Sequence, residues 1–301
     1  AISSLLKQTF RDFELIIVND GSTDGSAGII DQFDDDRIRV LTNEKNRGIV
    51  YSRNRGLAEI RGQFYAPFDS DDVAAPDKFE KQIGFLYQNP GIAMTGSWAR
   101  LMDENGRPTG ERWKLRASPD IIPSIMLFRN YFVHSSLLVR REVIRDVLYQ
   151  DGLDVVEDYR FCADLAFHHK VCNYPGYLID YRIHGNSAMR SDDNRMRNQD
   201  IKIYRYLFGH LGLELSNSDL NCIFVLKGKT RIDEFELLRE IHGFLLKVLS
   251  RNKAVRKFNR AALERVVARR WLKACYLAKH HHVRLLAHII SSPLTRLMLK
   301  S

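Results

Sequence analysis

Three carboxylates within four positions mark the part of the chain whose residue types could do chemistry. Asp69, Asp71 and Asp72 lie in the sequence FDSDD, directly after the apolar and aromatic run QFYAPF. Such a run is typical of a buried strand. Carboxylates this close repel one another and raise their own pKa values, so a cation or an extended ligand usually compensates them. Oxygen ligands in a short cluster favour Mg²⁺ or Mn²⁺, shared with the phosphates of a substrate.

A second interpretation of the same residues stays open. The helix-like pattern that follows Pro76 could begin with a solvated acidic turn, in which the carboxylates only cap the helix. A motif of this length does not by itself distinguish a metal or nucleotide site from such a turn.

The segments around the acids alternate between strand-like and helix-like patterns. An apolar run at 14–20 fits a parallel strand buried on both faces, and Ser22 or Thr23 is placed to cap the helix after it. The alternation predicts an α/β fold, a mostly parallel sheet flanked by helices. Strands are expected at 14–20, 37–43 and 63–68, and helices at 22–33 and 48–62. The acids then lie at the carboxyl end of a strand, where open α/β sheets bind their ligands.

The middle of the chain is more mixed, and its last acidic pair begins a helix. Glu157 and Asp158 open the helical pattern at 156–169, where the helix dipole is expected to keep a carboxylate ionised. The other expected elements are helices at 78–88 and 119–129, a hairpin that turns at 104–106, a strand at 131–140 and an extended segment at 175–184.

Composition limits the class of protein. The 301 residues are 45% hydrophobic and 28% charged, which suits one large domain with a smaller appendage. The four cysteines have no CxxC spacing, which favours a reducing cytosol over a disulfide framework or a zinc site. No apolar run approaches the roughly 20 residues that span a bilayer, and no signal peptide is visible, so we expect a cytoplasmic protein.

The positive charge belongs to the last third of the chain. From Ser191 onward there are 22 Lys/Arg against 10 Asp/Glu, a net charge of +12, whereas the first 190 residues carry −3. Apolar stripes on a helical period run beside these charges from residue 239. This composition is typical of a helix that lies on an anionic membrane surface. A helical appendage with a solvated basic face is the alternative, and few aromatic residues are present to stack nucleic-acid bases.

Four blocks of sequence, in order, resemble the family 2 glycosyltransferases of the GT-A fold. They are ISSLLKQTFRDFELIIVNDGSTD, NRGIVYSRNRGLAEIRGQFYAPFDSDD, VVEDYRF and PGYLIDYRIHGNS, which together run from about residue 1 to residue 187. The resemblance implies a GT-A domain over 1–190 and leaves a basic helical region over 191–301. It also implies an apolar strand ahead of residue 1, and a sheet without it would have a gap.

The resemblance implies an inverting, metal-dependent transfer of sugar from a nucleotide-sugar, most naturally a UDP-sugar. The acceptor would be a saccharide or a lipid-linked saccharide of a bacterial surface polysaccharide, and the enzyme could lie on the inner face of the membrane. Implied contacts to the nucleotide-sugar are Asp20 to the base, Ser22 in the nucleotide loop, Arg53 to the diphosphate, Asp69 to the ribose, and Asp71 and Asp72 to the Mn²⁺ or Mg²⁺. His184 would be a third metal ligand or a diphosphate contact.

The resemblance also chooses the catalytic base. Adjacent residues of a helix point about 100° apart, so one acid of the ED pair addresses the acceptor. The family pattern makes it Asp158, with Glu157 supporting the loop or contacting the acceptor. Alternatively, both are capping acids. His134 either lines the acceptor site or is a satisfied core histidine, and the run of three histidines at 280–282 fits a solvated helix end better than a metal tract.

Two other classes of function are weighed against the enzyme. A non-catalytic nucleotide-binding scaffold would have little need of both an intact DxD motif and an intact ED pair. A Rossmann dehydrogenase would carry GxGxxG after a strand, and this chain does not. The sequence therefore favours a glycosyltransferase.

Overall fold

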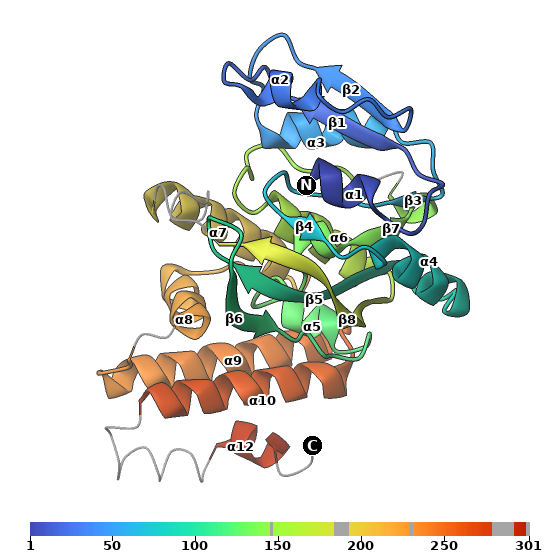
Figure 1. Ribbon diagram of the computed structural model, residues 1–301. Helices are drawn as coiled ribbons and strands as arrows, with labels where there is room; N and C mark the ends of the chain where they lie inside the picture. Colours follow the sequence, from blue (N-terminus) through green and yellow to red (C-terminus); the bar gives the residue numbers. More distant parts are fainter. Residues whose placement is uncertain (145–146, 184–192, 229–230, 279–291, 299–301) are drawn as a thin grey trace. The chain divides into compact units, whose positions relative to one another are not determined.

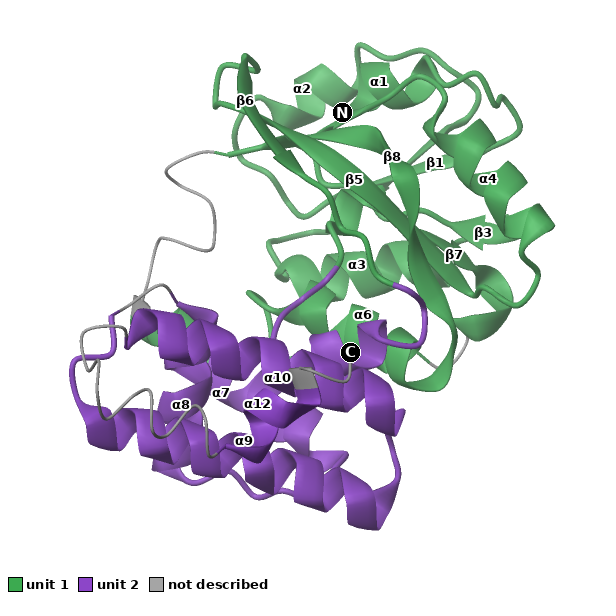
Figure 2. Ribbon diagram, turned by 90° about the horizontal axis from the view of Figure 1, so that it is seen from below, with its two compact units in different colours: residues 1–117, 132–199 green, residues 118–131, 200–301 purple. Residues whose placement is uncertain are grey.

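The computed structural model describes residues 1–144, 147–183, 193–228, 231–278 and 292–298. The chain forms two compact units, shown in different colours in Figure 2. The first unit contains residues 1–117 and 132–199, and the second contains 118–131 and 200–301. Residues 118–131 thus group with the helical unit, and the division into domains at residue 190 stays a prediction.

The first unit alternates strands and helices, as the sequence predicted. Its elements are α1 (Ile2–Leu6), β1 (Leu15–Asn19), α2 (Ser26–Ile30), β2 (Ile38–Thr42), α3 (Ile49–Ala58), β3 (Phe64–Tyr65), β4 (Val73–Ala74), α4 (Lys78–Gln88), β5 (Met94–Met102), β6 (Pro108–Trp113), η1 (His134–Ser136), β7 (Leu138–Arg140), η2 (Arg141–Val143), α6 (Glu157–His168) and β8 (Val171–Arg182). Helix α7 (Asp193–Gly209) begins in this unit and continues into the second.

Strands β1 and β2 form a separate two-stranded parallel ribbon, with α3 along it (Figure 1). The helix can approach closely because Gly56 lies against Val18, where an added Cβ would come within 3.2 Å of a Val18 methyl. The predicted burial of β1 on both faces is wrong, since residues 15–18 are only half-buried. A two-stranded ribbon gives each strand one neighbour, and this leaves more of its surface accessible.

The larger sheet has the order β3-β7-β5-β8-β4, with β6 paired to β5. The long β5–β8 ladder is parallel, like β1–β2, whereas the four shorter ladders of the sheet are antiparallel. The α/β class and the flanking helices are confirmed. The parallel arrangement applies to the two longest ladders, and the antiparallel pairs come from short strands and from the β5–β6 hairpin.

The predicted hairpin and the predicted α4 are both confirmed. Gly106 takes φ +81 in the turn between β5 and β6, a backbone conformation that glycine adopts without strain. The turn is closed by Asp103, whose Oδ1 accepts from the backbone N–H groups of Asn105 and Arg107. Helix α4 has the predicted bounds.

Several other predicted elements are shorter than their sequence patterns, and three of them show why. The run before the acids forms a strand only at β3, and residues 66–69 continue without regular structure. The predicted strand at 131–140 is interrupted by η1, so only β7 is extended. The predicted helix at 22–33 is reduced to α2. In each case the apolar pattern indicated only that the segment is buried or favours a conformation. The tertiary contacts decided where the backbone is regular.

The second unit is helical. Its elements are α5 (Ile122–Met126), the end of α7, α8 (Asn217–Lys227), α9 (Phe235–Val255), α10 (Arg260–Leu277) and α12 (Pro293–Met298). Helices α9 and α10 pack through apolar faces that include Phe244, Val248, Val267 and Trp271. The predicted helical C-terminal region is thus confirmed. None of the helices in the described ranges is both long and apolar enough to span a bilayer.

Candidate active site

Asp20 lies immediately after β1 and joins three segments of the small ribbon. Its Oδ1 accepts from Asn43 Nδ2 at 2.6 Å and from the backbone N–H of Arg47 at 2.9 Å, and its Oδ2 accepts from the backbone N–H of Gly48 at 2.8 Å. Burial alone would raise the pKa of Asp20, but hydrogen bonds, from Asn43 foremost, outweigh it and hold the pKa below its ordinary value. Asp20 is therefore an anionic anchor for the loop that leads into α3.

Glycine permits the turn that follows Asp20. Gly21 takes φ +67, and an added Cβ would lie 2.6 Å from the backbone of Lys45, so any larger residue would displace that loop. Ser22 is exposed, and its backbone N–H donates to Asn19 Oδ1 at 2.9 Å. The prediction that Ser22 or Thr23 caps the next helix is wrong, because α2 begins only at Ser26.

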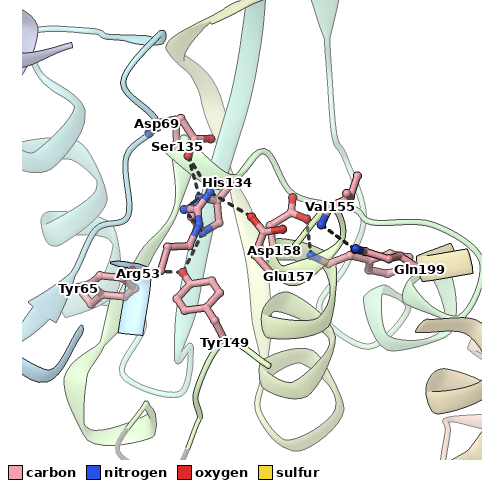
Figure 3. Close-up of polar contacts among 11 residues, drawn as sticks. Arg53, Tyr65, Asp69, His134, Ser135, Tyr149, Val155, Glu157, Asp158 and Gln199 are labelled. Atoms are coloured by element: carbon pink, nitrogen blue, oxygen red, sulfur yellow. Dashed lines mark hydrogen bonds and ion pairs between the residues drawn. The ribbon is translucent and has the colours of Figure 1, made fainter. Parts of the chain in front are cut away.

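Arg53, on α3, is the centre of a buried cluster of polar side chains (Figure 3). Its Nη2 lies 3.0 Å from Asp69 Oδ1 and 3.2 Å from Glu157 Oε1, and its Nη1 lies 2.7 Å from His134 Nδ1. The guanidinium also lies over the ring of Tyr149, 5.5 Å from its centroid. One arginine thus brings together two acids that are 88 positions apart in the sequence.

Two tyrosines complete the cluster next to Nε2 of His134, the ring nitrogen opposite the one that faces Arg53 most closely. Tyr149 Oη lies 2.8 Å from His134 Nε2 and 3.1 Å from Tyr65 Oη. Because Arg53 can only donate, its contact makes His134 Nδ1 an acceptor and leaves the proton on Nε2, which then donates to Tyr149. The ring of Tyr149 is stacked on Phe161 of α6, with centroids 4.5 Å apart.

Asn54 fixes the backbone of Tyr149 by a reciprocal pair of hydrogen bonds. Its Nδ2 donates to the Tyr149 carbonyl at 2.8 Å, and its Oδ1 accepts from the Tyr149 N–H at 2.9 Å. Two consecutive residues of α3, Arg53 and Asn54, therefore hold the cluster together.

The three acids of FDSDD have different surroundings. Asp69 is half-buried, and its backbone N–H donates to Ser135 Oγ at 3.0 Å. Asp71 is half-buried, and its carbonyl accepts from Arg182 Nε at 2.8 Å. Asp72 is only 1% exposed. Its Oδ1 accepts from the backbone N–H of Arg182, whereas its Oδ2 is buried without a hydrogen-bond partner.

The charges on these acids differ accordingly. Burial acts to raise the pKa of Asp69, but His134 and Arg53 hold it well below its usual range. Burial and Arg53 also lower the pKa of His134 and favour its neutral form. Arg53 is therefore the cation that keeps the pKa of Asp69 low. Burial, together with the nearby carboxylates of Asp69 and Asp71, raises the pKa of Asp72 to about 7.

Glu157 and Asp158 form the first turn of α6, but their side chains have different environments. Glu157 is 5% exposed and faces Arg53, whereas Asp158 is half-buried, with Oδ1 accepting from the Tyr159 N–H. Burial raises the pKa of both carboxyls, and at Glu157 the neighbouring Asp158 adds to this. At both acids the loss of solvation therefore acts against the ionised form, which the helix dipole favours.

We tested whether these residues suit a divalent cation. Within the part of the chain that is described, no group of three or more His, Cys, Asp or Glu side chains is placed to hold a metal ion. Mg²⁺ is usually bound by one or two carboxylates together with substrate phosphates, so Asp71 with the unpartnered Asp72 Oδ2 fits that pattern. His184 and the histidines at 280–282 lie outside the described residues.

The cluster contains residues that the sequence patterns did not single out. Ser135 accepts from the backbone N–H of Asp69, Tyr149 contacts His134, and Tyr65 contacts Tyr149. No spacing or motif marks them, because their partners are far away in the sequence. The interpretation of His134 as a satisfied core histidine agrees with its burial and its partners.

Comparison with known proteins shows the family of this chain. The model for glycosyl transferase family 2 matches residues 1–148. An uncharacterized glycosyltransferase of Haemophilus influenzae is 30% identical over 230 residues, which cover 71% of this chain and 71% of that protein. The chain belongs to glycosyl transferase family 2.

One further relative of this glycosyltransferase and one solved structure of the same fold carry more specific names. The UDP-Glc:alpha-D-GlcNAc-diphosphoundecaprenol beta-1,3-glucosyltransferase WfgD of Escherichia coli is 39% identical over 98 residues, 33% of this chain and 39% of WfgD. The crystal structure of S. aureus TarS 1–349 with UDP-GlcNAc matches with a TM-score of 0.54 and 16% identity. That match covers 87% of this chain and 85% of TarS 1–349, and it shows the shared GT-A fold.

Proposed function

We propose that this glycosyltransferase transfers a sugar from a UDP-sugar to a saccharide or lipid-linked acceptor in the synthesis of a cell-surface polysaccharide, with inversion at the anomeric carbon. One observation supports it most directly. Arg53 lies 3.0 Å from Asp69 and 3.2 Å from Glu157, so the DxD and ED motifs meet around one guanidinium (Figure 3). Transfer requires the sugar donor and the acceptor to be held next to each other, and the proximity of the donor motif DxD to the acceptor motif ED would do this.

The choice of UDP rests on Asp20 and on the relatives. WfgD is named for UDP-Glc, and TarS was solved with UDP-GlcNAc. Oδ2 of Asp20 accepts from the backbone N–H of Gly48, and the carboxylate is proposed to accept in addition from the N3–H of uracil. The diphosphoundecaprenol in the name of WfgD supports a lipid-linked acceptor.

Asp158 is proposed as the general base that takes the proton of the acceptor hydroxyl. Inversion needs that hydroxyl to attack opposite the departing diphosphate, with a carboxylate beside it. Of the ED pair, Asp158 is the more exposed, whereas Glu157 is turned toward Arg53. A raised pKa makes Asp158 a stronger base than an ordinary aspartate. Glu157 then positions Arg53 and through it Asp69.

Asp71 is proposed as the direct ligand of Mn²⁺ or Mg²⁺, and Asp72 as its buried support. Asp71 is half-buried, whereas Asp72 is 1% exposed and is bonded to the backbone of β8. When bound, such a cation stabilises negative charge on the leaving diphosphate. Asp71→Asn should therefore bind UDP-sugar less tightly in Mn²⁺, a loss that isothermal titration measures without any turnover.

A sugar-donor screen tests the proposed function. UDP-, GDP- and dTDP-sugars are offered with lipid-linked and soluble saccharide acceptors, with and without Mn²⁺, and nucleotide release is measured. We expect release of UDP that depends on both the acceptor and the cation. Release from only a GDP- or dTDP-sugar, or full activity in EDTA, would contradict the choice of UDP or of the metal.

A pair of acid variants tests the assignment of the base. Asp158→Asn should bind the UDP-sugar as wild type does but lose about 10²-fold or more in transfer rate. Glu157→Gln should be milder. Transfer by Asp158→Asn at close to the wild-type rate would show that this residue is not the base.

The second unit is proposed to bind the inner face of an anionic membrane. Arg265, Arg269, Leu272 and Tyr276 are all exposed, and their spacing puts them on one face of α10. A basic and apolar face is what an anionic lipid surface attracts. Flotation with anionic vesicles should carry the protein at low salt, and neutral vesicles are the control. Flotation that Arg265→Glu with Arg269→Glu leaves unchanged would reject this surface.

A further inference from the structure

The larger sheet carries an aromatic pair that is separate from the Arg53 cluster. The rings of Trp113 and Tyr181 are 5.2 Å apart, centroid to centroid, with 37° between their planes. Trp113 is 41% exposed, although an indole has more apolar surface than almost any side chain. It is the last residue of β6, a strand whose residues are all exposed.

The strand register explains why these two rings meet. Trp113 of β6 pairs with Ala99 of β5, and on the other side of β5 Ala99 pairs with Ile179 of β8. Tyr181 follows Ile179 by two positions, so it has the same facing as Ile179 and Ala99. The small side chain of Ala99 leaves room above β5 for the two rings from the flanking strands.

The same face of the sheet leads to the acids. Tyr181 packs on the cluster of Ala99, Val133 and Ile179 together with Phe68, the residue before Asp69. Its neighbour Arg182 bonds to Asp72 and to the carbonyl of Asp71. Burial, together with the nearby carboxylates of Asp72, Asp69 and Asp158, raises the pKa of Tyr181 to about 12. The pair therefore runs from solvent to the edge of the acid cluster.

The pair also lies on the opposite side of the acids from the nucleotide loop. In Figure 1 the β1–β2 ribbon, with Asp20 at its end, is at the top of the first unit, and β4, β8, β5 and β6 follow below it in that order. Asp71 and Asp72 directly precede β4, the strand of this group nearest to the ribbon, whereas Trp113 ends β6, the farthest from it. A nucleotide-sugar that reaches the acids from Asp20 therefore leaves the Trp113 side to the second substrate.

We propose that Trp113 and Tyr181 form the binding platform for a pyranose ring of the acceptor saccharide. This inference rests on the proposed function and specifies the acceptor side of its site. The face of an aromatic ring carries partial negative charge, and the C–H groups of a sugar carry partial positive charge. The C–H face of a pyranose is therefore attracted to the face of an indole and stacks on it. The hydroxyl groups on the edge of the pyranose stay free for hydrogen bonds.

Steady-state kinetics with matched variants is the first test. Trp113→Ala should raise the KM for the acceptor roughly tenfold, the order of one aromatic contact, and leave the KM for the UDP-sugar unchanged. Trp113→Phe keeps a ring face and should recover most of the affinity. Tyr87→Ala is the control, because Tyr87 is also an exposed aromatic of the first unit, at 60%, and packs edge-on against Phe64. A role of Trp113 in stability alone would lower Tm without separating the two KM values, and this would overturn the proposal.

Fluorescence quenching is the second test and needs no turnover. The chain has three tryptophans, and Trp98 and Trp271 are 7% and 0% exposed, so acrylamide should quench mainly Trp113. Cellobiose, lactose and N,N′-diacetylchitobiose are the probes. At least one should protect the wild type from quenching, and Trp113→Phe should lose the quenchable signal.

The two tests separate failure of this inference from failure of the proposed function. If the wild type transfers sugar but Trp113→Ala keeps the wild-type KM for the acceptor, the platform is wrong and the enzyme assignment stands. If the wild type transfers no sugar, the quenching measurement decides. Protection of Trp113 by a disaccharide then supports a saccharide platform, and equal quenching with and without all three probes overturns it.

Discussion

The first unit holds two carboxylate sites that are built differently. Asp20 accepts hydrogen bonds from neutral groups, the Asn43 side chain and the backbone N–H groups of Arg47 and Gly48. Asp69 instead lies against the charged guanidinium of Arg53, which it shares with Glu157. The partners of Asp20 are within 28 positions of it, whereas the second cluster takes residues from α3, η1 and α6.

The two sites differ in how much of their carboxylate charge remains available to a ligand. Neutral donors keep Asp20 ionised without cancelling its charge, so it remains a good acceptor for a nucleobase. In the second site charge is cancelled inside the protein, and removal of one member leaves the others buried and unpaired. We therefore expect the Arg53 cluster to be fragile and the Asp20 site to be tolerant, and four measurements examine this contrast.

The largest effect is expected from Arg53→Met. It leaves Asp69 and the 5%-exposed Glu157 without their cation, which costs about 3–5 kcal/mol when a buried pair is broken. Urea unfolding should report that loss, and sugar transfer should disappear. The double variant Arg53→Met with Glu157→Gln removes one stranded charge and should recover part of the stability. A single variant within 1 kcal/mol of wild type would show that the cluster is not held by charge.

The next effect is the pH dependence of transfer. The pKa of Asp158 is raised, so its deprotonated, active form is present above that pKa and is lost as the pH falls through it. Transfer should fall about tenfold per pH unit on the acid side, at a pH above the ordinary aspartate value of about 4. Binding of UDP without a divalent cation, which relies on Asp20 with its lowered pKa, should stay constant over the same range. Transfer that is flat down to about pH 4 would contradict a base with a raised pKa.

A smaller effect is expected from Asp20→Asn. The amide keeps one acceptor oxygen but places an NH₂ group against a backbone N–H, so stability should fall by about 1–3 kcal/mol. The affinity for UDP should fall as well. The kcat of transfer, which depends on Asp158, should persist once the sugar donor is bound. Comparison of Kd with kcat separates the two sites, and an equal loss in both would mean that they are coupled.

The smallest effect is expected from Tyr149→Phe. The variant keeps the stack on Phe161 and the backbone pair with Asn54, and removes only the hydroxyl that faces His134 and Tyr65. We expect a loss of about 1 kcal/mol in the free energy of unfolding and a few-fold lower kcat, because His134 then holds Arg53 less firmly. An unchanged kcat together with an unchanged pH profile would show that Tyr149 does not position the acids.

The sequence alone determined the features that depend on local patterns. The alternation of strands and helices gave the α/β class, and the bounds of α4 and the turn at Gly106 followed from periodicity and turn residues. The order of four motif blocks indicated the family, which the relatives then showed. Residue types were enough to mark Asp69, Asp71, Asp72, Glu157 and Asp158 as the acids to examine.

Only the tertiary structure decided which of those acids is buried and what each one contacts. Asp71 and Asp72 are neighbours in the chain, but the backbone of β8 encloses one of them and leaves the other half-buried. Arg53 could be a solvent-facing helix residue by its sequence, and it became a buried centre because His134, Tyr149 and Glu157 arrive from segments more than 80 positions away. Periodicity describes one segment at a time, whereas burial and pairing depend on which segments the fold brings together.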